Sequence, residues 1–126
     1  SLSDRWADGA EAYLGTMTSG FPNLFLLYGP NTNTGHTSVI FKLEQQFALV
    51  RKLMTCAQRG TVRVKPEREA AYNTDIQRRL RRTAWDRIDT SWYRDGGKVT
   101  NNWPGSSLEF RRRLNRPNLK HFEFAP

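Results

Sequence analysis

Apolar residues form one continuous run in the first quarter of the chain. The run is LFLLY, Leu24 to Tyr28, and it lies between Pro22 and the pair Gly29–Pro30. Five consecutive apolar residues between chain breakers are typical of a strand covered on both faces, as in a parallel sheet flanked by helices. We therefore expect a buried strand at residues 24–28, although no second run of this kind supplies a parallel neighbour.

A long amphipathic helix is predicted after this run. Apolar residues recur there at steps of three and four, which places them on one helical face. These residues are Val39, Leu43, Phe47, Val50, Met54 and Ala57. We expect Thr34 or Thr37 to cap the start of the helix and Gly60 to end it. Cys56 lies at a helical spacing from Leu53, so we expect its thiol to be buried and structural.

The second half of the chain predicts shorter elements. TVRVKP, residues 61–66, alternates as a short strand does, and its proline opens a helix that we expect to reach about Arg87. The apolar positions of that helix are Tyr72, Ile76, Leu80 and Ala84.

Residues 91–105 predict an irregular hairpin around Asp95–Gly96–Gly97. Ser106 and Glu109 form a capping box before a third helix, and HFEF, residues 121–124, predicts a last strand. The pattern indicates an α+β fold with about three helices, one buried strand and a hairpin.

Charge is distributed unevenly along the chain. The net charge is +8, and residues 1–48 carry two of the 20 basic and four of the 12 acidic side chains, so the excess lies in residues 49–126. Arginines cluster at residues 78–82 and 111–113, with Tyr72 and Trp85 interleaved, which leaves open a small basic nucleic-acid-binding module. A solvated helix face explains the same arginines, and we favour that interpretation.

Composition limits the compartment and the kinds of site. No apolar run approaches the roughly 20 residues that span a bilayer, and no signal peptide is evident, so we expect a cytoplasmic protein without membrane contact. Cys56 is the only cysteine, and no His, Cys and acidic residues have metal-ligand spacing, so neither an internal disulfide nor a metal site is expected. The chain begins with Ser1 rather than methionine, which favours a piece of a longer polypeptide.

A polar turn separates the apolar run from the first long helix. Residues 31–36, Asn-Thr-Asn-Thr-Gly-His, offer small and amide side chains and one imidazole. The backbone N–H groups of the next residues lie at the positive end of the helix dipole, where an anion or a polarised carbonyl oxygen is favoured. An ordinary capped loop explains the same pattern, and the residues alone leave both readings open.

Two motifs carry a resemblance to a known family. YLGTMTSGFPNLFLLYGPNTNTGHTSVIF and the later SWYRDGGKVTNNWPG closely resemble the C-terminal end of Baeyer–Villiger-type flavin-containing monooxygenases, especially the branch that acts on cyclic and aryl ketones. The resemblance extends from about Asp4 to the end of the chain. It implies an FAD- and NADPH-dependent enzyme that inserts one atom of O2 into a small-molecule ketone. A related N- or S-oxygenating flavin monooxygenase is the alternative within this class.

The resemblance also implies which residues contact the cofactors. The residues implied to line FAD are Gly29, Pro30, Asn31, Thr37, Ser38 and Val39. Reduced flavin carries negative charge that a helix N-terminus stabilises, so this assignment agrees with the chemistry of the polar turn. Trp92 matches the family tryptophan that contacts the nicotinamide cofactor, although a core-packing role is the alternative. His36 is a candidate hydrogen-bond donor to the flavin, but a capping or solvent-facing role is favoured.

Other parts of such an enzyme are missing from this sequence. No glycine fingerprint G-x-G-x-x-G follows a strand, and by resemblance the catalytic arginine lies upstream, so no catalytic residue is assigned. We therefore expect a C-terminal fragment of a flavoprotein with two dinucleotide-binding domains. Residues 1–60 would be the strand–helix portion of its FAD domain and residues 61–126 a helix and hairpin extension. Alone, the fragment is expected to be inactive, to retain neither FAD nor NADPH, and to self-associate through its unpaired strand.

Overall fold

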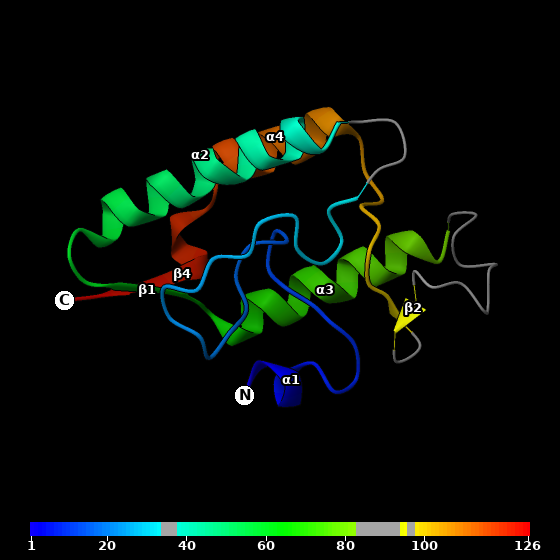
Figure 1. The fold of residues 1–126 in the computed structure, drawn as a ribbon, viewed down its shortest axis with the longest axis horizontal. Coiled ribbons are helices and arrows are strands. Elements are labelled where there is room, and N and C mark those ends of the chain that lie inside the picture. The colour runs from blue at the N-terminus through cyan, green and yellow to red at the C-terminus, as the bar shows by residue number, and fades with distance from the viewer. Residues whose placement is uncertain (34–37, 83–93, 96–97) are drawn as a thin grey trace.

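The chain folds as an α+β unit in which two long helices, a short helix and a small sheet surround one core (Figure 1). A computed structural model describes residues 1–33, 38–82, 94–95 and 98–126. The elements in chain order are α1 (Leu2–Arg5), α2 (Val39–Ala57), β1 (Thr61–Val64), α3 (Pro66–Leu80), β2 (Arg94–Asp95), β3 (Lys98–Val99), α4 (Ser107–Asn115), η2 (Leu119–His121) and β4 (Phe122–Ala125). No helix of the described residues is long and apolar enough to cross a membrane.

Helix α2 forms where its period predicts, but the predicted buried face is wrong. The residues buried in the described structure are Lys42, Gln45, Gln46, Leu49 and Leu53. Several residues of the predicted face are instead exposed, including Phe47 at 54% and Met54 at 57%, and Ile40 beside them is 69% exposed. The side of α2 that carries three polar residues faces the core and α4, because its amides and ammonium find hydrogen bonds or aromatic rings there. Periodicity locates the apolar stripe of a helix without identifying what the stripe packs on.

The ends of α2 also differ from the prediction. Ser38 is the N-cap, and its hydroxyl accepts a hydrogen bond of 3.1 Å from the Phe41 N–H. Thr34 and Thr37, the two predicted caps, lie outside the described residues. The helix ends at Ala57 with Gln58 as its C-cap, so Gly60 does not end it.

The expected buried thiol is also wrong. Cys56 is exposed although its spacing from Leu49 and Leu53 places it on the same side of α2. It lies in the last turn, one residue before the helix ends at Ala57, so a shared helical side does not ensure burial there.

The predicted strand at Leu24–Tyr28 is not formed. The segment is an extended loop in which Leu27 is exposed, and Asn23 and Tyr28 on its borders have positive φ angles of 59° and 54°. Its backbone bonds go to other loops and to a side chain, as in the bond of 2.7 Å from the Leu26 N–H to the Thr16 carbonyl. A strand needs a neighbour with free ladder groups, and the described part of the chain places none beside this run.

The predicted elements of the second half form where they are described, but the helix after β1 is shorter than predicted. β1 pairs with β4 in an antiparallel sheet with Thr61 opposite Ala125. Helix α3 begins at Pro66, as predicted, but ends at Leu80 with Arg81 as its C-cap, well before Arg87. In α4, Ser106 caps the helix by accepting from the Glu109 N–H at 3.1 Å. The hairpin is confirmed in part, since β2 and β3 pair antiparallel with Asp95 opposite Lys98.

One hydrophobic core collects side chains from both halves of the chain. Its members include Tyr13, Leu14, Met17, Leu49, Leu53, Val62, Val64, Tyr72, Ile76, Leu80, Val99, Trp103, Phe110, Leu114 and Phe122. The predicted apolar face of α3 is confirmed in Tyr72, Ile76 and Leu80, all of which are buried. The loops before α2 are therefore packed against a core that the later helices and the sheet complete.

Candidate functional site

The polar turn and the second motif lie side by side, although about 70 residues separate them along the chain. The Asn31 N–H donates to the Thr100 carbonyl at 2.9 Å, and its side-chain amide donates to the carbonyls of Val99 at 2.7 Å and Asn102 at 2.9 Å. Two further backbone hydrogen bonds complete a short parallel bridge. The Asn33 N–H donates to the Asn101 carbonyl, and the Trp103 N–H donates to the Asn33 carbonyl. The structure thus joins the two sequence motifs into one site.

Gln46 of α2 holds the other side of this turn. Its amide oxygen accepts from the Tyr28 N–H at 2.6 Å, and its amide nitrogen donates to the Gly15 carbonyl at 3.0 Å and to the Thr16 hydroxyl at 3.1 Å. Gln46 is fully buried, so these bonds form away from water. Because Tyr28 has a positive φ angle of 54°, the bond from its N–H helps to fix an otherwise strained turn. Gln46 therefore couples helix α2 to the start of the site.

Gly29 is required by a close approach of two loops. A Cβ atom at this position would overlap the carbonyl oxygen of Gly15, which lies on the loop that Gln46 also holds. Thr32 strengthens the same turn, since its hydroxyl donates to the Gly29 carbonyl at 2.7 Å. A side chain at Gly29 would push the two loops apart and displace the residues that follow.

The start of α2 is the part of the site that is open to a ligand. Within the described residues, the N–H groups of Val39 and Ile40 have no acceptor, whereas the Phe41 N–H is capped by Ser38. Ser38, Val39 and Ile40 are all exposed. Free N–H groups at the positive end of a 19-residue helix favour a carbonyl oxygen or an anion. The arrangement fits the polar, electron-rich edge of a reduced flavin ring.

Lys42 contributes an unusual buried charge one turn into α2. Its ammonium group lies 4.0 Å from the ring centroid of Phe110 and 6.0 Å from that of Trp103. Within the described residues the Lys42 Nζ has no hydrogen-bond partner. Burial lowers the pKa of this amine to about 8. The aromatic rings of the α4 side replace part of the hydration that the ammonium has lost.

The structure places only some of the residues implied to bind cofactors. Gly29, Pro30 and Asn31 lie together in the turn, and Ser38 and Val39 lie at the exposed start of α2. Asn31 is buried, and its side-chain amide donates hydrogen bonds to carbonyls of the second motif. In the described structure Asn31 therefore positions the turn. Contact of these five residues with a flavin stays a prediction.

The other predicted positions, Thr37, His36 and Trp92, lie outside the described residues. Their implied contacts with flavin and nicotinamide remain predictions that rest on the sequence resemblance alone.

Gln46 and Asn102 are site residues that the sequence analysis missed. Both are polar residues that are at least 99% buried, and hydropathy patterns assign such residues to the surface. A signal was available for Gln46, because it follows Lys42 by four positions and precedes Leu49 by three, which is the spacing of a helical face. No comparable signal marks Asn102, whose partner is 71 residues away.

Replacing Gln46 with leucine keeps a side chain of similar size on α2 but removes the amide. We expect the free energy of unfolding to fall by about 2 kcal/mol, because the Tyr28 N–H and the Gly15 carbonyl lose their partner. Urea denaturation measures the change. Glu44→Leu on the exposed side of the same helix is the control, and it should shift stability by less than about 0.5 kcal/mol. Equal effects of the two substitutions would contradict the role given to Gln46.

Curated relatives of the chain are monooxygenases. It is 42% identical over 116 residues to a Baeyer–Villiger monooxygenase of Pseudomonas aeruginosa, a match that covers 87% of this chain and 22% of that protein. It is 35% identical over 131 residues to the FAD-binding monooxygenase ktnD of Aspergillus niger, covering 97% of this chain and 22% of that protein. The chain therefore spans about a fifth of the length of these relatives. No protein-family model matches it.

The fold is shared with a solved monooxygenase. The cyclohexanone monooxygenase from Rhodococcus sp. Phi1 bound to NADP+ superimposes with a TM-score of 0.78 at 25% identity. The match covers 97% of this chain and 24% of that protein. Nearly all of the described α+β unit thus corresponds to one part of a much longer structure.

Proposed function

The chain is homologous to a part of the Baeyer–Villiger and FAD-binding monooxygenases, and from this relationship we propose that it works within a longer FAD- and NADPH-dependent enzyme. The proposed reaction inserts one atom of O2 into a ketone. The observation that carries the proposal is the 42% identity to the Pseudomonas aeruginosa Baeyer–Villiger monooxygenase across 87% of the chain. In such an enzyme, NADPH supplies electrons to FAD, and the reduced flavin reacts with O2.

The part of this chain in that enzyme would be to hold one edge of the flavin. The N–H groups of Val39 and Ile40 would bind the polar edge of the ring, and Gly29 and Pro30 would contribute the adjoining turn. The hydrogen bonds of Asn31 and Gln46 would keep that turn in place without touching the cofactor. Pyrophosphate binding would fall to other parts of the longer polypeptide, since no glycine fingerprint is present in the sequence.

The exposed apolar side of α2 supports a longer polypeptide. Ile40, Phe47 and Met54 are between 54% and 69% exposed, and all three lie on the side of the helix that points away from this core. A helix with apolar residues on the side away from its own core is typical of a contact with a further layer of structure. We propose that this side packs on the rest of the flavoprotein. The chain covers about a fifth of the length of its relatives, so the rest would be about four-fifths of the longer polypeptide.

The domain division stays a proposal. Residues 1–60 would be part of an FAD domain, and residues 61–126 would form an extension of it. Self-association of the isolated chain also stays a prediction, but its physical basis changes. The unpaired strand is not formed, and the exposed side of α2 is the surface that would drive association.

The proposed reaction is tested in the longer polypeptide that contains this sequence. After purification with its flavin, the enzyme should oxidise NADPH faster when a cyclic or aryl ketone is added, and mass spectrometry should find an ester or lactone one oxygen heavier than the ketone. Amine- or sulfide-dependent turnover without ester formation would select the alternative N- or S-oxygenating enzyme. A polypeptide that contains no flavin would contradict both.

Trp92→Ala is the prediction that tests the nicotinamide contact. In the longer enzyme we expect the KM for NADPH to rise about tenfold, because the loss of a stacking or hydrogen-bonding contact of about 1.4 kcal/mol corresponds to that factor. Flavin content should stay unchanged, and Trp92→Phe should recover part of the affinity. Steady-state kinetics with NADPH as the varied substrate measures the effect. Unchanged KM and unchanged coupling of NADPH oxidation to product would contradict the assignment.

Several arginines of the basic clusters have acidic partners, which supports a solvated face over a nucleic-acid interface. Arg79 makes two bonds of 2.8 Å to the Glu109 carboxylate, and the hydrogen bond from Arg79 is the main cause that lowers the pKa of Glu109. Arg78 pairs with Asp75. Phosphate-binding surfaces keep their arginines free for the nucleic acid backbone. The nucleic-acid-binding module therefore remains the weaker alternative.

A further inference from the structure

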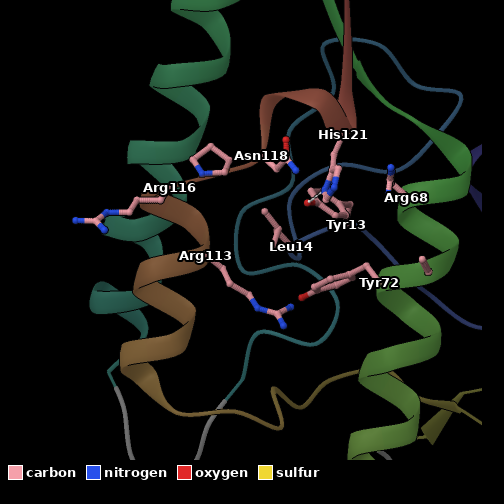
Figure 2. A pocket seen from close by; sticks show the side chains of 10 residues that line it. Tyr13, Leu14, Arg68, Tyr72, Arg113, Arg116, Asn118 and His121 are labelled. Atoms are coloured by element: carbon pink, nitrogen blue, oxygen red, sulfur yellow. Dashed lines mark hydrogen bonds between the residues drawn. The ribbon is translucent and has the colours of Figure 1, made fainter.

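A pocket of about 380 Å³ lies between α3, α4 and the turn of η2 (Figure 2). Its walls are basic and aromatic. Arg68 comes from α3, Arg113 and Arg116 come from the end of α4 and its C-cap, and His121 comes from η2. None of the residues that line it is acidic. The volume is within the range of pockets that hold small molecules.

The positive charge around the pocket is only partly neutralised within the described structure. Arg113 binds Glu109 through its Nε at 3.1 Å, which leaves its terminal N–H groups for other partners. Arg68 and Arg116 have no carboxylate within 4 Å among the described residues, and both are exposed at the pocket rim. The guanidinium groups of Arg113 and Arg68 border the cavity, and such groups are used by proteins to bind phosphate and carboxylate, whereas Figure 2 shows the Arg116 side chain extending away from it.

A buried hydroxyl without a partner lies in the same wall. Tyr72 of α3 is 7% exposed, and within the described residues its hydroxyl has no hydrogen-bond partner. Figure 2 shows its ring extending from α3 toward the side chain of Arg113, whose guanidinium carbon is 5.9 Å from the ring centroid. Burial raises the pKa of Tyr72, so the hydroxyl keeps its proton and remains a donor. A buried donor that lacks an acceptor is destabilising unless a ligand or water supplies one.

We propose that this pocket binds a phosphate group, with Tyr72 and Arg113 as its inner donors and Arg68 as its outer one. Each of these groups is a hydrogen-bond donor, and a tetrahedral dianion offers acceptors in several directions at once. The pocket has space beyond the phosphate itself, which suits a phosphomonoester as well as the free ion. The proposal does not depend on the monooxygenase activity, because the pocket is built entirely from residues of this chain.

His121 makes the proposed binding depend on pH. Its Nδ1 lies 2.6 Å from the Tyr13 hydroxyl, and its pKa is lowered chiefly by burial and also by the positive charges of Arg68 and Lys65. Arg113 and Arg116 on α4 add positive charge from the opposite wall. A bound dianion would offset these charges and favour the protonated imidazole, so binding takes up a proton. The affinity for sulfate, whose charge does not change over this range, should therefore increase as the pH falls from 8 to 5.5.

Calorimetric titration of the purified protein with inorganic phosphate at low ionic strength tests the proposal. We expect saturable binding at a single site. Tyr72→Phe should weaken it about fivefold and Arg68→Gln about tenfold. Without phosphate, the midpoint of thermal unfolding should rise in Tyr72→Phe, because a buried donor that lacks an acceptor is removed, and should stay unchanged in Arg68→Gln, because Arg68 is exposed. Arg51→Gln, an exposed arginine of α2, is the matched control and should leave binding unchanged.

Further titrations separate the possible ligands and the pH effect. Tighter binding of phenyl phosphate than of inorganic phosphate would support an organic phosphomonoester as the ligand, and equal binding would support the free ion. Sulfate keeps its charge between pH 8 and 5.5, so its affinity reports the protonation of His121 without titration of the ligand. Acetate that binds as tightly as phosphate would overturn the proposal. Absence of saturation at 10 mM phosphate, or equal losses in Arg68→Gln and Arg51→Gln, would overturn it as well.

Discussion

Replacing Glu69 with alanine is expected to lower the free energy of unfolding by about 4 kcal/mol, the largest loss that we predict for a single substitution. Glu69 is fully buried on α3. Its carboxylate accepts from the Ser19 N–H at 2.8 Å, from the Thr18 hydroxyl at 2.9 Å and from Arg5 at 3.1 Å. Alanine would leave a cavity, and the buried Thr18 hydroxyl and the partly buried Ser19 N–H would lose their acceptor.

The control for this substitution is Glu67→Ala on the same helix. Glu67 is exposed in the first turn of α3, so its removal should change the free energy by no more than about 0.5 kcal/mol through the helix dipole. Denaturation in urea, followed by circular dichroism, measures both variants. A loss below about 1 kcal/mol for Glu69→Ala would show that the loop at residues 18–19 does not depend on the carboxylate.

Lys42→Met is expected to have the opposite effect and to stabilise the protein at pH 7 by about 2 kcal/mol. Lys42 is 1% exposed, and burial lowers its pKa from 10.5 to about 8. The folded state therefore binds the proton more weakly than the unfolded chain, and below pH 8 this difference destabilises the fold by about 3 kcal/mol. The loss of the cation–π contact with Phe110 offsets about 1 kcal/mol of the gain in the methionine variant.

The pH dependence distinguishes this cause from a simple improvement in packing. The stability of the unaltered protein should rise between pH 8 and 10.5, because the unfolded state then holds a proton that the folded state has lost. Lys42→Met should lack this rise, so the two stability curves should converge at high pH. Lys52→Met, an exposed lysine on the same helix, should retain it. Parallel curves for Lys42→Met and the unaltered protein would contradict the explanation.

The local elements of this fold could be predicted from the sequence because their signals are local. The period of α2 and α3, Pro66 at a first helical turn and Ser106 at an N-cap all act within a few residues. The strand predicted at residues 24–28 failed for the opposite reason. A strand is defined by its neighbour, and an apolar run carries no information about whether the rest of the chain provides one.

The buried side of α2 could not be predicted for a related physical reason. Apolar residues occupy two sides of this helix: Leu49 and Leu53 face the core of this chain, and residues such as Phe47 and Met54 do not. The wider apolar stripe, which contains Phe47 and Met54, has the stronger periodic signal, and for this reason the sequence predicts that it faces the core. The burial of Gln46 could not be predicted, because burial of an amide depends on partners such as the Gly15 carbonyl, which the sequence does not reveal.

The candidate site was predicted in its parts but not in its assembly. The glycine–proline turn and the helix start after it were both identified from their residue types. Their attachment to residues 99–103 depends on hydrogen bonds of Asn31 and Asn33 with backbone far along the chain. Such contacts depend on tertiary structure, and neither hydropathy nor residue propensity reports them.

The pairing of β1 with β4 has a consequence for the order in which the protein assembles. Thr61 lies opposite Ala125, so the pair closes a loop that includes α3, α4 and everything between them. Closing a long loop is slower than forming a helix, and the helices should therefore form before the sheet. During synthesis on the ribosome, β1 emerges first and stays unpaired until β4 has followed it. Over that interval its backbone is open to another nascent chain, which makes this edge the step of folding most exposed to aggregation.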